Sequence, residues 1–195
     1  MHIVIGLDPG ARGRSTGAAI AEYRGKGGII LEAYTLTMSE ARGLIDSLDP
    51  HVLVIDSPLS HPERGPWRSV DLLARRLGLR VLPPGWRGMR RLVDETTRLL
   101  LSIGSQPLVL ETHPSSVLRV AGCGFEELLE RLGCTLLDRP SNKHERDAVI
   151  AACVGVAFLS GRWARIEARD GSIWLVDPIV CRYPPTTDSR GSLAD

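Results

Sequence analysis

The sequence contains no apolar stretch close to the roughly 20 residues that a membrane-spanning helix needs. Its first residues also show no basic flank with a cleavage site behind it, so no secretory signal peptide is indicated. We therefore expect a cytoplasmic protein that does not insert into a membrane. A length of 195 residues predicts one domain, at about 150 residues per domain, and no internal repeat divides it.

Cysteine motifs for metal binding are missing as well. The cysteines show neither a Cys-x-x-Cys motif nor a Cys/His zinc spacing: Cys123, Cys134, Cys153 and Cys181. This pattern favours scattered buried thiols and leaves open whether any of them pair.

Lysine is almost absent, because Lys26 and Lys143 are the only two in a chain with 24 basic residues. Arginine binds phosphate through a bidentate fork, but a GC-rich genome produces the same bias. The formal net charge of +1 argues against a surface coated in positive potential. Composition alone therefore does not decide whether nucleic acid is the partner.

The strongest pattern that is present is a short apolar run that ends in an acid. Three such runs indicate buried strands of an α/β sheet: residues 3–7 before Asp8, 52–55 before Asp56 and 108–110 before Glu111. In such sheets, ligands bind outside the carboxyl ends of parallel strands. The alternative is that each acid only ends its strand, since Asp8-Pro9-Gly10 is also ordinary turn chemistry.

A fourth acid lies on a helix expected from about residue 142 to 159. Asp147 shares its helical stripe with Ala151, Val154 and Phe158, which predicts that it faces the core. A buried carboxylate is costly unless it is paired or metal-bound. Converging carboxylates repel one another, and a hard cation with oxygen ligands relieves this, so Mg²⁺ or Mn²⁺ is the expected cofactor.

Three further residues are candidates for supporting roles. Glu145 either assists the acids or only forms a capping box with Asn142 at the start of the helix. His113 and His144 are candidates for proton transfer, with a purely structural role as the alternative for His113. Glu111 is a further candidate catalytic acid.

Arginines dominate the stretch from Arg64 to Arg98, which also contains Trp67 and Trp86. This mixture suits phosphate contact and base stacking, whereas the alternative is a solvated helix surface with both tryptophans in the core. The residues predicted to contact nucleic acid are Arg12, Arg14, Arg64, Arg68, Arg87, Arg90 and Arg91.

Other segments carry weaker signals. Strands are expected at 16–24, 28–37, 80–82 and 173–180, and helices at 40–48 (capped by Ser39), 71–77, 89–103 and 125–132.

The opening Gly6-Leu7-Asp8-Pro9-Gly10, followed by Ser15-Thr16-Gly17, is similar to the start of Holliday-junction resolvases and other ribonuclease H-like nucleases. The resemblance implies that Asp8, Asp56 and Asp147 are metal ligands from the first strand, the fourth strand and the last helix. Resolvases carry glutamate at the place of Asp56 and a further acid on the last helix, where this chain has His144 or Ile150.

A second resemblance covers most of the chain. Residues 54–59, the arginine-rich middle, Glu111-Thr112-His113-Pro114 and the helix with Asp147-Ala148 resemble domain-of-unknown-function family 429 (DUF429). That group is regarded as ribonuclease H-like, so the resemblance bears on the fold more than on activity.

We therefore expect an α/β ribonuclease H-like domain over residues 1–183, followed by a disordered polar tail, 184–195. Its mixed sheet should have five strands in the order 3-2-1-4-5 and helices on both faces. The predicted function is that of a Mg²⁺- or Mn²⁺-dependent phosphodiester nuclease on DNA or RNA, and a homodimer is the candidate assembly. The alternatives are a catalytically inactive nucleic-acid- or protein-binding module, and an actin-like ATPase or phosphotransferase, which needs a duplicated domain that 195 residues cannot hold.

Overall fold

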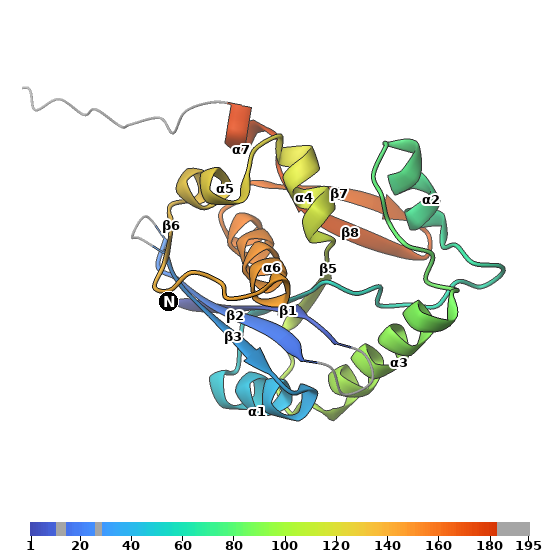
Figure 1. The fold of residues 1–195 in the computed structure, drawn as a ribbon, viewed down its shortest axis with the longest axis horizontal. Coiled ribbons are helices and arrows are strands. Elements are labelled where there is room, and N and C mark those ends of the chain that lie inside the picture. Colours follow the sequence, from blue (N-terminus) through green and yellow to red (C-terminus); the bar gives the residue numbers. More distant parts are fainter. Residues whose placement is uncertain (11–14, 26–28, 183–195) are drawn as a thin grey trace, which may run out of the picture.

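A six-stranded sheet with mixed strand directions forms the centre of the protein (Figure 1). The computed structural model describes residues 1–10, 15–25 and 29–182. In the sheet the strands lie in the order β5-β4-β1-β2-β3-β6. They are β1 (His2–Asp8), β2 (Thr16–Tyr23), β3 (Ile29–Leu36), β4 (Val52–Ile55), β5 (Leu108–Glu111) and β6 (Cys134–Leu136).

The sheet contains the five predicted strands in the predicted order, but the prediction of only five was wrong. The sixth strand, β6, pairs parallel to β3 beyond the expected edge. It has three residues, which is too short for an alternating pattern to reveal it. Strands β1, β4 and β5 run parallel to one another, so their carboxyl ends meet at one edge.

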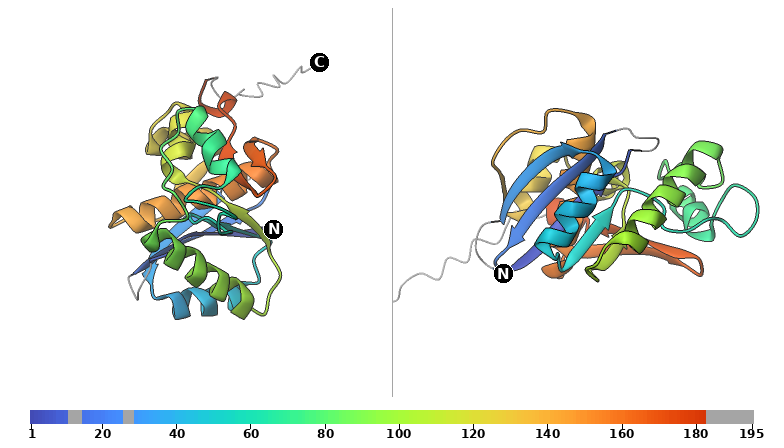
Figure 2. Two further views of the ribbon diagram at one scale, coloured as in Figure 1. Left: turned by 90° about the vertical axis from the view of Figure 1, so that its right-hand side faces the viewer. Right: turned by 90° about the horizontal axis from the view of Figure 1, so that it is seen from below.

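Helices cover both faces of the sheet (Figures 1 and 2). On one face, α1 (Met38–Leu48) and α3 (Arg87–Ser102) enclose a core that includes Ile5, Leu53 and Ile55. On the other face, α6 (Lys143–Leu159) packs on the sheet in the larger core. The remaining elements are α2 (Ser69–Arg76), α4 (Pro114–Ala121), α5 (Phe125–Leu132), α7 (Ile179–Arg182) and a hairpin of β7 (Trp163–Ala168) and β8 (Gly171–Val176).

Two glycines allow α6 to lie directly on the sheet. A Cβ atom on Gly6 would come within 2.2 Å of the Ala148 carbonyl oxygen, and one on Gly17 within 2.0 Å of the His144 carbonyl oxygen. A close-packed interior has no room for such contacts. The backbone of α6 therefore approaches the sheet closely at Gly6 and Gly17, and this brings the first turns of the helix to the end of β1.

Some local predictions were wrong. Residues 80–82 form no strand, because Pro83 and Pro84 directly follow and lack backbone donors for a ladder. Thr37, not Ser39, caps α1, in a capping box with Glu40. The late strand ends at Val176 rather than at residue 180, and its partner β7 was not predicted.

The cysteines divide into two pairs. Cys123 and Cys181 form a disulfide between the α4–α5 connection and α7, whereas Cys134 and Cys153 are free and buried. The expectation of scattered buried thiols therefore holds only for the second pair. The bonded cysteines are 58 residues apart, so tertiary packing brings them together without a local sequence signal.

Other expectations concern segments that the structure does not describe. The predicted disordered tail, 184–195, lies outside the described residues, as do residues 26–28 between β2 and β3. Within the described ranges, no helix combines the length and the apolar character needed to cross a membrane.

Candidate metal centre

Asp8, Asp56 and Asp147 meet at the carboxyl edge of the parallel strands, and we call them the acid triad. Each offers a carboxylate oxygen, and these atoms all lie within 4.8 Å of one another. The Asp56 amide donates to the Leu7 carbonyl oxygen at 2.8 Å, which fixes the ends of β1 and β4 side by side. Because α6 begins close to this edge, the sequence-predicted metal ligands from two strands and one helix come together.

Among the described residues, the negative charge of the acid triad is compensated only in part. Burial raises the pKa of Asp56 well above its ordinary value, and the charges of Asp8 and Asp147 raise it further. Burial also raises the pKa of Asp8, although a hydrogen bond and the charge of His144 oppose this. Carboxylates in this state gain most from a bound cation, whose charge removes their mutual repulsion.

The cationic side chains beside the triad come from the first turn of α6. Lys143 Nζ lies 3.0 Å from Asp147 Oδ2, but 80 % of the Lys143 side chain is exposed. His144 Nδ1 lies 2.6 Å from Asp8 Oδ2, with 41 % of its side chain exposed. Because the basic partner in each pair reaches solvent, both side chains can move aside for an ion. Three convergent carboxylates with solvent access fit the oxygen-rich coordination of a hard divalent cation.

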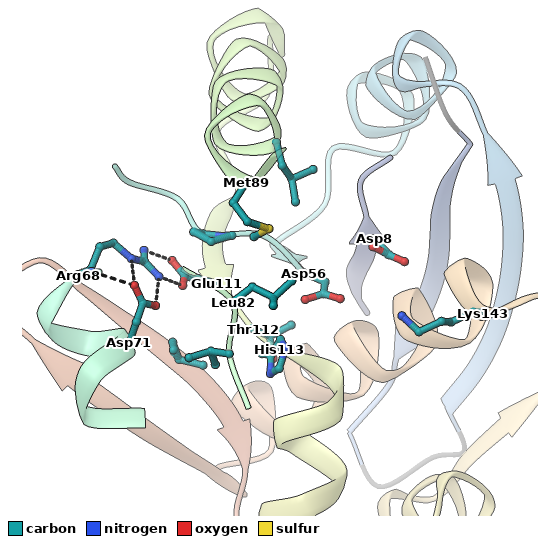
Figure 3. A pocket seen from close by; sticks show the side chains of 14 residues that line it. Asp8, Asp56, Arg68, Asp71, Leu82, Met89, Glu111, Thr112, His113 and Lys143 are labelled. Carbon is teal, nitrogen blue, oxygen red and sulfur yellow. Dashed lines mark hydrogen bonds and ion pairs between the residues drawn. The ribbon is translucent and has the colours of Figure 1, made fainter. Parts of the chain in front are cut away.

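Glu111 lies in a separate buried group with Arg68 and Asp71, which we call the arginine cluster (Figure 3). Arg68 Nη1 donates to Glu111 Oε2 at 2.8 Å, and its Nε and Nη2 donate to Asp71 at 3.0 and 2.8 Å. The Leu59 amide also donates to Glu111, at 2.9 Å. Burial raises the pKa of Glu111 despite these contacts. The carboxylate of Glu111 is thus already paired within the protein.

The expectation that Arg68 contacts nucleic acid is not met, because its side chain is only 1 % exposed and its guanidinium is used within the arginine cluster. Arg12 and Arg14 lie outside the described residues. The other predicted arginines retain solvent contact: Arg64, Arg87, Arg90 and Arg91.

Glu145 serves the N-terminus of α6. Its carboxylate accepts hydrogen bonds from Thr35 Oγ1 at 2.6 Å and from the Ser141 amide and hydroxyl at 2.6 and 2.8 Å. Its own amide donates to Asn142 Oδ1 at 3.0 Å. Burial favours the neutral acid, but these hydrogen bonds outweigh it and lower the pKa of Glu145. Of the two roles considered for Glu145, these contacts favour the local structural one.

His113 precedes α4 and faces the space beside the triad. Its Nδ1 lies 2.7 Å from Ser116 Oγ, which orients the ring. Burial lowers the pKa of His113, so its imidazole is neutral at pH 7. A neutral imidazole can accept or donate one proton, and proton transfer by His113 or by His144 remains a prediction.

A pocket with a volume of ≈ 210 Å³ connects the acid triad with the arginine cluster (Figure 3). Asp8, Asp56 and Lys143 line it, as do all members of the arginine cluster. Its walls include apolar side chains from the segment before α3 and from α3 itself: Val81, Leu82, Met89 and Leu92.

Neither this apolar wall nor the part played by Asp71 was predicted from the sequence. A signal for Asp71 did exist, because an acid three residues after the N-cap is typical of a helix start. The Arg68 amide indeed donates to Asp71 Oδ2 at 3.1 Å. By contrast, the pairing of Arg68 with Glu111 joins residues far apart in the sequence and left no local trace.

Comparison with known proteins finds similarity of fold alone. No protein-family model and no curated protein matches the chain. RuvC of Thermus thermophilus has 15 % identity and a TM-score of 0.46, over 82 % of this chain and 96 % of that one. RuvC of T. thermophilus in complex with a Holliday junction substrate has 14 % identity and a TM-score of 0.48, over 83 % and 96 %. The yeast mitochondrial Holliday junction resolvase Ydc2 has 13 % identity and a TM-score of 0.42, over 81 % of each chain.

Proposed function

We propose that this chain is a divalent-metal-dependent phosphodiester nuclease that acts on DNA or RNA. The observation that carries the proposal is the acid triad, whose carboxylate oxygens lie within 4.8 Å of one another. The raised pKa values of Asp8 and Asp56 support it, because they reflect charge that a cation would stabilise. The resemblance of residues 6–17 to ribonuclease H-like nucleases implies the same ligands.

In this proposal Asp8, Asp56 and Asp147 hold Mg²⁺ or Mn²⁺. When bound, such an ion polarises the phosphodiester and lowers the pKa of a bound water. Lys143 would then be free to contact a phosphate oxygen, because 80 % of its side chain is exposed. His144 can hold a proton at Nδ1, the atom that faces Asp8.

A catalytically inactive nucleic-acid-binding module is the second candidate. The contacts of Lys143 with Asp147 and of His144 with Asp8 favour it, because they partly neutralise the triad without an ion. Such a module would bind oligonucleotides with a strong dependence on salt and would cleave none of them in any divalent metal.

The test measures Mn²⁺ binding and cleavage on the same preparation. Calorimetric titration of Mn²⁺ into EDTA-treated, dialysed protein gives the affinity. Fluorescent single strands, duplexes and four-way junctions of DNA and RNA report cleavage. We expect Asp8→Asn, Asp56→Asn and Asp147→Asn each to weaken Mn²⁺ binding and to reduce cleavage by about 100-fold or more.

Glu130→Gln is the matched control, because it removes an exposed acid on α5 and should leave both measurements unchanged. A wild-type protein that binds Mn²⁺ and oligonucleotides without cutting them would select the inactive module. Cleavage by Asp8→Asn and Asp147→Asn at the wild-type rate would exclude the acid triad as the reactive centre.

A further inference from the structure

The pocket beside the acid triad has a size that the metal ligands do not explain. Its volume is ≈ 210 Å³ (Figure 3). An apolar cavity of about 150 Å³ holds one benzene molecule. Pockets for drug-sized molecules measure roughly 300–1,000 Å³. The space therefore suits a single planar group of one or two rings.

The walls of the pocket are suited to the flat faces of such a group. Leu82 lies before α3, and Met89 and Leu92 lie on α3. Ile173 comes from β8, much later in the sequence. Apolar side chains pack well against ring faces. A phosphate or a free cation would lose hydration against these walls without compensation.

Polar groups are available for the edge of a ring. The carboxylates of Asp71 and Glu111 accept from Arg68, but a carboxylate has about four acceptor sites and can take further N–H donors. The neutral imidazole of His113 also lines the pocket. A ligand with apolar faces and an uncharged, hydrogen-bonding edge therefore matches both kinds of lining.

Large apolar side chains remain exposed close to the pocket. Leu82, which lines it, is 56 % exposed, and Trp86, directly before α3, is 58 % exposed. Arg87 and Arg90 follow in the first turn of α3 and are also exposed. An exposed tryptophan beside arginines is a typical surface for stacking and phosphate contact along an unpaired strand.

We propose that the pocket holds the base of the nucleotide whose phosphate lies at the acid triad. For its substrate class this inference rests on the proposed nuclease function. Asp8 and Asp56 belong to both the acid triad and the pocket lining. One nucleotide can therefore place its phosphate at the triad and its base in the pocket. A base enters such a pocket only after it leaves its stack and its pair. The strand at this site is therefore unpaired, and single strands or opened segments are preferred over continuous duplex.

The first test detects base binding without metal or phosphate. Of Met1, Met38 and Met89, it is Met89 that lines the pocket. We expect adenosine, guanosine, cytidine or uridine, added in EDTA, to shift the Met89 methyl NMR signal and to leave the other two unchanged. Leu82→Trp, which fills the pocket, should weaken this binding by about tenfold or more. The matched control is Leu101→Trp, at an 82 % exposed position on α3, and should have no effect.

The second test uses oligonucleotides in Mn²⁺. Single strands should be cut faster than duplexes, and removal of the one base that enters the pocket should lower kcat/KM by about tenfold. A Met89 shift in a protein that cuts nothing would support the base site and overturn only the nuclease. Triad-dependent cutting of duplex and single strand at equal rates, with no Met89 shift, would overturn the base site and leave the nuclease standing.

Discussion

Asp8 and Asp56 of the acid triad line the same pocket as the arginine cluster (Figure 3), yet the protein balances the charges of the two groups in opposite ways. In the arginine cluster, the guanidinium of Arg68 is buried and donates to both Asp71 and Glu111. In the acid triad, the contacts come from Lys143 and His144, whose side chains are 80 % and 41 % exposed. One group has its cation built into the fold, whereas the ion-pair partners that the described residues give to the other are exposed side chains.

This difference separates a group whose charges are balanced within the fold from a candidate metal site. A buried ion pair is expensive to break but need not bind anything, because its charges already satisfy one another. Buried acids with raised pKa values and a weak protein counterion are typical of functional centres. Burial raises the pKa of both Glu111 and Asp56, but of these two acids it is Glu111 that has a buried cationic partner, Arg68.

The largest change in the free energy of unfolding is expected when Arg68, the buried cation of the arginine cluster, is removed. Arg68→Met leaves two buried carboxylates without their partner, so the free energy of unfolding should fall by about 3–5 kcal/mol. Urea unfolding followed by tryptophan fluorescence measures this. Arg76→Met, at an exposed position on α2, should change it by less than about 0.5 kcal/mol. A loss for Arg68→Met as small as that of the control would mean that the arginine cluster does not stabilise the fold.

Glu145 shows a third way in which the fold stabilises an ionised acid, because its carboxylate accepts hydrogen bonds from neutral donors. Glu145→Gln turns an amide NH₂ toward donors such as the Ser141 amide, and it should lower the free energy of unfolding by about 2 kcal/mol at pH 7. The pKa of Glu145 is lowered in the folded state, so the wild type keeps this advantage above the ordinary value of 4.5. The advantage should disappear as the pH falls from 4.5 through the lowered pKa.

Unfolding curves of both proteins at several pH values test this expectation. Glu130→Gln, which alters an exposed acid on α5, is the control and should show no such pH dependence. A difference between wild type and Glu145→Gln that stays constant down to pH 2 would contradict the role assigned to the ionised carboxylate.

Sequence reasoning reached the acid triad because each member carries a local signal. Asp8 and Asp56 follow apolar strands, and Asp147 lies on the buried stripe of a long helix. It did not reach the arginine cluster, because Arg68 and Glu111 are 43 residues apart and meet only after β5 and α2 have packed. The short strand β6 escaped for a similar reason, since its pairing with β3 comes from tertiary contact.

The smallest expected change in the free energy of unfolding is an increase, and it tests the difference between the acid triad and the arginine cluster most directly. Asp56→Asn removes a carboxyl group whose ionised form is disfavoured by burial and by the charges of Asp8 and Asp147, so in EDTA at pH 7 it should raise the free energy of unfolding by on the order of 1 kcal/mol. Glu111→Gln should lower it, because it weakens charge-assisted hydrogen bonds to Arg68. Urea unfolding of both variants gives the two signs. A loss of stability in both would mean that the protein already compensates the acid triad as fully as the arginine cluster, and would remove the electrostatic reason for a metal.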